Sequence, residues 1–192
     1  MRARAEAGFS LTELLVVIAI IGMLAAMVGG TVMLVRTRAK SYQNRLMMQH
    51  LKEAVIQMKA AYDYSGPIGL DENDEPLPPA QQDLIDIGWE LDPLSDAWGA
   101  PKDKDELHFN KRLMRFYTVK KRQVAGGHLV DVFGNRIRYL LEERTMPRPD
   151  GTGNVRVVDE YLLSYGPDGQ PDEVSGGNDD EKVKLGSYSL KE

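Results

Sequence analysis

Five carboxylates close to the C-terminus are side chains whose type could bind a metal ion. They share a glycine-rich segment, and they are Asp168, Asp172, Glu173, Asp179 and Asp180. Ca²⁺ takes about six to eight oxygen ligands, which carboxylates and the carbonyls of a turning loop can supply. Their spacing does not match the EF-hand pattern D-x-[DN]-x-[DN]-G. On these residues alone a solvated acidic loop is the simpler interpretation, and a calcium site is the alternative.

Side chains that could act as nucleophiles or as acid and base catalysts form no recognisable constellation. The chain has no cysteine, which excludes disulfides, thiolate zinc sites and cysteine nucleophiles. The histidines His50, His108 and His128 stand alone, outside the H-E-x-x-H and G-x-S-x-G patterns of metalloproteases and hydrolases. We therefore expect no enzymatic activity.

The overall charge argues against a nucleic-acid partner. The net charge is -5, and the 24 lysines and arginines are scattered along the 192 residues. Neutralising phosphates needs a concentrated basic surface, which this sequence does not provide. The length allows one ordinary domain plus an appendage, and the 42% apolar content is enough for a core.

The appendage is a long apolar segment near the N-terminus. Residues 14–35 read LLVVIAIIGMLAAMVGGTVMLV without a charge. Roughly 22 residues are enough to cross a hydrocarbon core of about 30 Å as a helix. A cleaved secretory signal would have a shorter apolar run of about 7 to 15 residues, so we expect a membrane anchor. Basic residues occur on both sides of the run, so charge does not decide its orientation.

Glu13 lies at the edge of this apolar run. An ionised carboxylate there is costly without a partner, which predicts a specific cation close to it. A second interpretation is local, because Ser10-Leu11-Thr12-Glu13 also matches the S-x-x-E capping box that begins helices. Both roles stay open on the residues alone.

The remaining sequence predicts a helix followed by a sheet. Apolar residues recur every three or four positions from Ala39 to Tyr62, so one continuous helix from about Phe9 to Tyr64 is expected, roughly 80 Å long. Ser65-Gly66-Pro67 ends it. Later runs typical of strands are residues 129–132, 136–142, 155–158 and 161–165, whereas 107–124 is ambiguous between helix and strand.

The N-terminal junction resembles the signature of type IV pilins and pseudopilins. Residues 8–22 read GFSLTELLVVIAIIG, and the resemblance implies a leader of residues 1–8 that a prepilin peptidase removes after Gly8. It also implies N-methylation of the new terminus at Phe9, and pairing of Glu13 with the free terminal amine of a neighbouring subunit. It places the N-terminus in the cytoplasm and the C-terminal domain in the periplasm, with one pass through the inner membrane.

Two later segments are similar to the major pseudopilin of type II secretion systems. They are DVFGNRIRY at residues 131–139 and SYGPDGQ at residues 164–170, although Val132, Phe133 and Arg136 depart from the family pattern and a long insertion precedes Asp131. In that family the second segment leads into a loop that binds structural calcium. The ligands implied here are Asp168 and Asp179 first, then Asp180, Asp172 and Ser164.

The resemblance implies an α+β pilin fold, in which a long N-terminal helix packs on a small antiparallel sheet. The expected parts are the leader at 1–8, a transmembrane helix at 9–35, its amphipathic continuation at 36–64, a connecting region at 65–128 and the sheet with its acidic loop at 129–192. The implied function is a filament subunit of a type II secretion pseudopilus. Its implied partners are the prepilin peptidase, identical and related pseudopilins, an assembly ATPase and an inner-membrane platform protein.

Two other functions stay open. A type IV pilus or competence pilin often closes its C-terminal domain with a disulfide, which a chain without cysteine cannot form. A membrane-tethered binding module that forms no filament would share the apolar helix and stay uncut at Gly8. The absence of cysteine favours the pseudopilin, because bound calcium could take the place of the disulfide.

Overall fold

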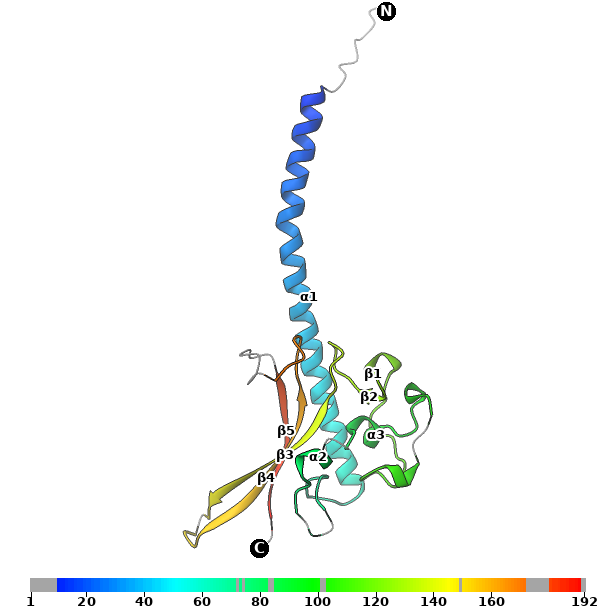
Figure 1. Cartoon of the computed structure of the whole chain (residues 1–192), viewed down its shortest axis with the longest axis vertical. Coiled ribbons are helices and arrows are strands. Elements are labelled where there is room, and N and C mark those ends of the chain that lie inside the picture. The colour runs from blue at the N-terminus through cyan, green and yellow to red at the C-terminus, as the bar shows by residue number, and fades with distance from the viewer. Residues whose placement is uncertain are drawn as a thin grey trace, which may run out of the picture. The chain divides into compact units, whose positions relative to one another are not determined.

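The computed structural model describes residues 10–71, 73, 75–82, 85–100, 103–148, 150–171 and 180–190, except for the side chains of residues 27–31, 34, 79 and 80. The helices are α1 (Leu11–Ala61), α2 (Pro79–Gln82) and α3 (Ile87–Leu91), and the strands are β1 (Val124–Ala125), β2 (His128–Leu129), β3 (Arg138–Pro147), β4 (Asn154–Ser164) and β5 (Glu181–Ser189) (Figure 1). Three short 3-10 turns occupy the region between α3 and β1. The expected α+β class is confirmed.

The chain divides into two compact units, residues 1–39 and residues 40–192. In the first unit α1 begins at Leu11, and its large apolar side chains from Leu11 to Leu24 are exposed. Among the described residues, no helix combines the length and apolar content required of a membrane span.

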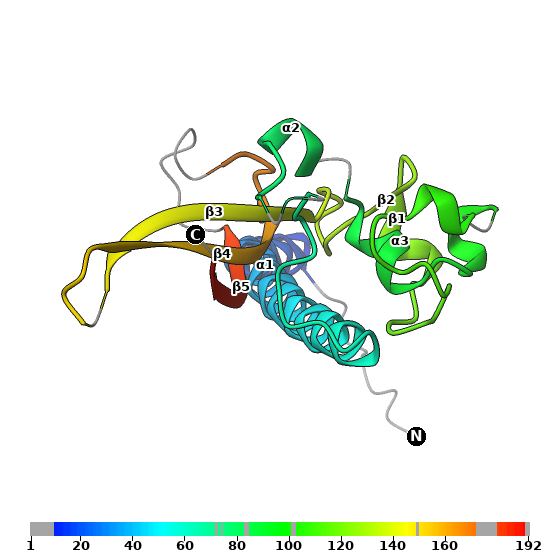
Figure 2. The same ribbon diagram turned by 90° about the horizontal axis from the view of Figure 1, so that it is seen from below.

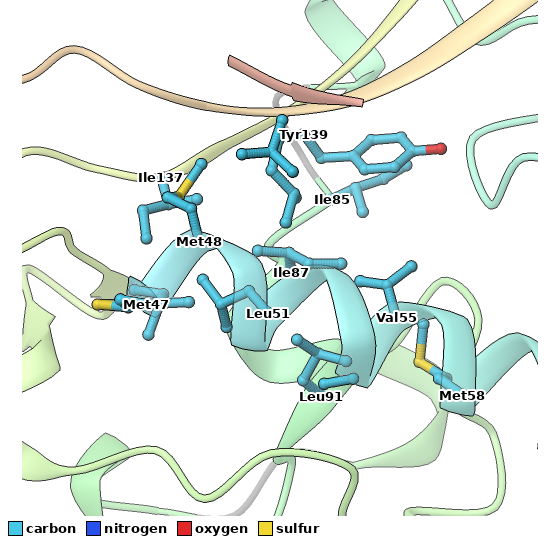
Figure 3. Close-up of a cluster of buried hydrophobic side chains, with 14 of the residues drawn as sticks. Met47, Met48, Leu51, Val55, Met58, Ile85, Ile87, Leu91, Ile137 and Tyr139 are labelled. Carbon is cyan, nitrogen blue, oxygen red and sulfur yellow. The ribbon is translucent and has the colours of Figure 1, made fainter. Parts of the chain in front are cut away.

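In the second unit the apolar stripe of α1 is buried. Met47, Met48, Leu51, Val55 and Met58 are at most 8% exposed and follow the three- and four-residue spacing of one helix face. Figure 3 shows these side chains beside residues from α3 and from the segment that enters β3. The residues that complete this core include Ile85, Ile87, Leu91, Ile137 and Tyr139. The helix ends where Asp63 takes a positive φ of 51°, just before the expected stop.

The sheet of the second unit has the order β3-β4-β5 and is antiparallel throughout. The expected strand at 136–142 corresponds to β3, and the two strands expected at 155–158 and 161–165 are one continuous strand, β4. Both observed strands extend further than predicted where they continue into a shared hairpin. The prediction for 129–132 was wrong in extent: the strand is His128–Leu129, in a small hairpin with β1, and Val130 adds an isolated bridge to Arg136. β5 was not predicted at all, because alternating lysines hide its apolar positions Val183 and Leu185.

The tip of the β3–β4 hairpin, residues 145–147 and 154–156, extends beyond the region that pairs with β5 (Figure 2). Residues 142–147 of β3 are exposed on both faces. Nearer the core, the outer edge of β3 is capped by a side chain, because the Leu141 N–H donates to Gln82 Oε1 at 2.8 Å. The edge ends at Pro147.

The connecting region is ordered by two buried carboxylates of the α3 segment rather than by long helices or strands. Glu90 accepts hydrogen bonds from the backbone N–H groups of residues 108–110, at 2.5, 3.1 and 2.7 Å. Asp92 accepts from the Val119 N–H at 2.9 Å and from Arg115 Nε at 2.7 Å. Residues 107–124 are therefore mostly irregular, with one 3-10 turn at Lys121–Gln123 and the first position of β1 at their C-terminal end.

Candidate functional site

The start of α1 carries the residues predicted to direct processing and assembly. Gly8 and Phe9 lie outside the described residues. Glu13 lies in the first turn, where its Oε2 accepts from the Ser10 N–H at 2.9 Å, while Ser10 Oγ accepts from the Glu13 N–H at 3.2 Å. The reciprocal capping box predicted from the sequence is therefore formed. The second role of Glu13, pairing with another subunit, stays a prediction.

The apolar side chains that follow Glu13 are exposed around the whole helix. Five consecutive residues, 14 to 18, are each 47–58% exposed. Successive residues on an α-helix are about 100° apart, so five in a row cover its full circumference. Over residues 14–18 the described helix is exposed on every side, and such a surface is suited to lipid or to other helices.

The two segments that resemble pseudopilins meet at the end of β4. Ser164 Oγ donates to Asp131 Oδ2 at 2.6 Å and accepts from Asn44 Nδ2 of α1 at 2.9 Å. The second carboxylate oxygen of Asp131 accepts from the Phe133 and Asn135 N–H groups at 2.8 and 2.9 Å. Residues 131–135 and 164–166 thus form one buried hydrogen-bond network with the helix.

This geometry bears on the predicted calcium ligands. The hydroxyl of Ser164 is already engaged on both its donor and acceptor sides. Asp168 is exposed and accepts from the Gln170 N–H at 3.0 Å, and Asp180 directly precedes β5. Asp172 and Asp179 lie outside the described residues. The described ranges contain no group of three or more histidine, cysteine, aspartate or glutamate side chains placed to hold a metal ion.

A buried charged cluster between α1 and the sheet was missed from the sequence. Lys59 Nζ bonds Glu160 Oε2, and Tyr188 OH lies 3.0 Å from the amine and 3.1 Å from the same oxygen. Glu160 Oε1 accepts from Tyr139 OH at 2.6 Å and from the Ile68 N–H at 3.1 Å. The side chains of Lys59 and Glu160 are only 8% and 0% exposed.

Burial perturbs the titration of this cluster. It lowers the pKa of Lys59, an effect that the adjacent carboxylate opposes. Burial, together with the same carboxylate, raises the pKa of Tyr139 and of Tyr188 above the usual value for phenols. Two features of the sequence could have indicated the cluster: Lys59 extends the apolar stripe of α1, and Glu160 interrupts an apolar strand.

The histidines do not assemble a catalytic constellation among the described residues. His128 Nδ1 lies 2.6 Å from Asp86 Oδ2, and the other oxygen of Asp86 caps α3 by accepting from the Gly88 N–H at 3.1 Å. The pair joins β2 to the start of α3 and lines a groove with Trp89 and His108. Its geometry is explained by this structural role.

Residues 3–29 match the family model described as the prokaryotic N-terminal methylation motif. No curated protein and no solved structure matches the chain. The matched region contains Gly8, Phe9 and Glu13, and it supports a type IV pilin-like protein with a prepilin-type signal. Such a motif implies processing by a prepilin peptidase and assembly into a filament.

Proposed function

We propose that this chain is a structural subunit of a type II secretion pseudopilus. The observation that carries the proposal is the methylation motif at residues 3–29 joined to a helix whose apolar side chains are exposed all round. Support for the pseudopilin class comes from the contact between residues 131–135 and 164–166, the two segments similar to pseudopilins, and from the absence of cysteine.

In this proposal the precursor is inserted in the inner membrane through residues 9–35, with the folded domain in the periplasm. Cleavage after Gly8 exposes the amine of Phe9, which is then methylated. An assembly ATPase and a platform protein draw the subunit from the bilayer, so that contact with lipid is exchanged for contact with neighbouring helices. The Phe9 amine of an adjacent subunit then supplies the positive charge that pairs with Glu13, whose carboxylate would otherwise be unpaired in an environment without water. The growing filament pushes secreted proteins outward.

We also propose structural calcium in the β4–β5 connection. This connection runs from residue 165 to residue 180 and contains four of the predicted ligands: Asp168, Asp172, Asp179 and Asp180. The support is the density of carboxylates in one glycine-containing loop, which suits a hard cation. Calcium would join the ends of two neighbouring strands.

The test of the assembly role separates the two functions of Glu13. Glu13→Gln keeps an acceptor for the Ser10 N–H, because glutamine also serves in a capping box, but it removes the charge. Filament yield should fall about tenfold or more, since a close ion pair in a low dielectric exceeds the roughly 1.4 kcal/mol that a factor of ten requires. Ser10→Ala is the matched control, because it weakens the cap by about 1 kcal/mol and keeps the charge.

Both variants should be measured in cells that carry the whole secretion system, with mass spectrometry of the membrane-extracted protein to verify processing. We expect a mature chain that begins at methylated Phe9 in all cases, with filaments lost only in Glu13→Gln. Gly8→Leu should leave the leader attached and prevent assembly. Normal filaments built from the uncut precursor would contradict the proposal.

A further inference from the structure

The inner face of β4 alternates between apolar and polar residues. Val158, Glu160, Leu162 and Ser164 are all fully buried. The two polar members are paired with α1, Glu160 with Lys59 and Ser164 with Asn44. Polar contacts therefore hold the helix at two separate points along this strand.

The apolar contacts between these two points do not fix the position of α1 along its own axis relative to the sheet. Met47, Leu51 and Val55 follow each other at intervals of four residues, and all three are buried. A shift of α1 by one turn, about 5.4 Å, would place one apolar side chain where another had been. Methionine adapts to irregular space, so the cost of such a shift is reduced further.

The charged pair responds differently to the same shift. In one direction the position of Lys59 would be taken by Val55, which leaves the Glu160 carboxylate without a cation. In the other direction it would be taken by Asp63, which lies beyond the end of α1 and has the same charge as Glu160. Both alternatives bury an uncompensated charge, which is strongly unfavourable.

The contact at Ser164 has the same property. A shift of one turn replaces Asn44 with Lys40 or with Met48. Met48 has no N–H group to donate to the hydroxyl, and Lys40 could donate only by bringing its charged ammonium group into this buried contact.

We propose that Lys59–Glu160 and Asn44–Ser164 are positioning pairs that fix the axial register of α1 on the sheet. The inference rests on the proposed function, because a subunit pulled or pushed through its helix must pass that force to its folded domain. Apolar packing resists separation of helix and sheet, and the two polar pairs resist sliding. Register, rather than net stability, is the property that the pairs supply, because replacing both members of a buried ion pair leaves no uncompensated charge.

The test measures register directly in the full-length chain in detergent. The protein has no cysteine, so the substitutions Gln57→Cys on α1 and Ser189→Cys on β5 introduce the two thiols that react with spin labels. Both positions are exposed. Electron paramagnetic resonance should give one distance between the labels in the otherwise unchanged protein. The variant Lys59→Met/Glu160→Gln/Asn44→Leu should show a second population, displaced by up to about 5 Å.

The variant is designed to fold, since the glutamine introduced by Glu160→Gln would keep an acceptor for Ile68 and Tyr139, and Ser164 would still donate to Asp131. The matched control is Lys182→Met/Glu142→Gln, an exposed pair on the same sheet, which should leave a single distance. A single unchanged distance in the triple variant would overturn the proposal. So would its failure to fold, because that outcome assigns these groups to stability. Absence of filaments in wild-type cells would instead count against the proposed function and leave the distances unaffected.

Discussion

Replacing Lys59 with methionine should destabilise the folded domain by several kcal/mol. The substitution conserves length and apolar stem but leaves the Glu160 carboxylate, which is fully buried, without its cation. Breaking a buried ion pair by removing one partner costs about 3–5 kcal/mol. The hydrogen bonds from Tyr139, Tyr188 and Ile68 remain, so we expect a value near the lower end of this range. Domains of this kind have a total stability of about 5–15 kcal/mol, so the change is a large fraction of it.

The assay is urea unfolding of the full-length chain in a mild detergent, followed by tryptophan fluorescence. Trp89 stacks on Trp98 with ring centroids 4.3 Å apart, so unfolding of the connecting region changes the signal. Glu160→Gln in the Lys59→Met background should recover most of the lost stability, because no buried charge is left. Lys182→Met, at an exposed ion pair, should cost less than about 1 kcal/mol. A loss below about 1 kcal/mol in Lys59→Met would refute the reasoning.

Three further outcomes are expected. Glu90→Ala leaves the three backbone N–H groups of residues 108–110 without their acceptor. It should lower the free energy of unfolding by about 3 kcal/mol or more and speed amide hydrogen exchange at these residues. Unchanged exchange would contradict this prediction. Burial raises the pKa of Tyr139, so the contribution of its neutral hydroxyl to the free energy of unfolding is complete below about pH 10 and is lost as the pH rises further. In urea titrations at alkaline pH, the stability advantage of wild type over Tyr139→Phe should therefore shrink. A difference that stays constant with pH would exclude the effect. Removing calcium with a chelator should increase hydrogen exchange in residues 165–180, whereas a rate independent of calcium would argue against the proposed ion.

The main helix and the fold class could be predicted because their signals are local. The apolar stripe of α1 repeats at helical spacing over its buried half, and its end at Ala61 falls just before the glycine and proline that follow. The motif around Gly8, Phe9 and Glu13 is also contiguous, so the family model and the reading of the residues agree there. The capping box between Ser10 and Glu13 forms within four residues.

The features that were missed depend on contacts between distant residues. Glu90 organises a segment 18 to 20 positions away, and Glu160 meets Lys59 across 101 positions. The interruption of an apolar strand by Glu160 is a local signal, but an acidic residue in a strand is typical of a solvent-facing position, and the cation that Glu160 pairs with lies far away in the sequence. β5 was not predicted for the same reason, because its own sequence has few apolar residues and its strand conformation depends on pairing with the distant β4.

The capped edge of β3 has a consequence for the proposed filament, in which many copies of the chain would lie side by side. An open strand edge invites the same edge of another molecule to pair with it, and such pairing propagates into aggregates. Here Gln82 occupies the Leu141 N–H, and the strand ends at Pro147, which has no N–H to offer. The charged residues 142–144, which lie between Leu141 and Pro147, disfavour close packing of this edge against a strand of another molecule. Pairing of copies through this edge of the sheet is thereby disfavoured, in agreement with the proposed assembly through the N-terminal helix.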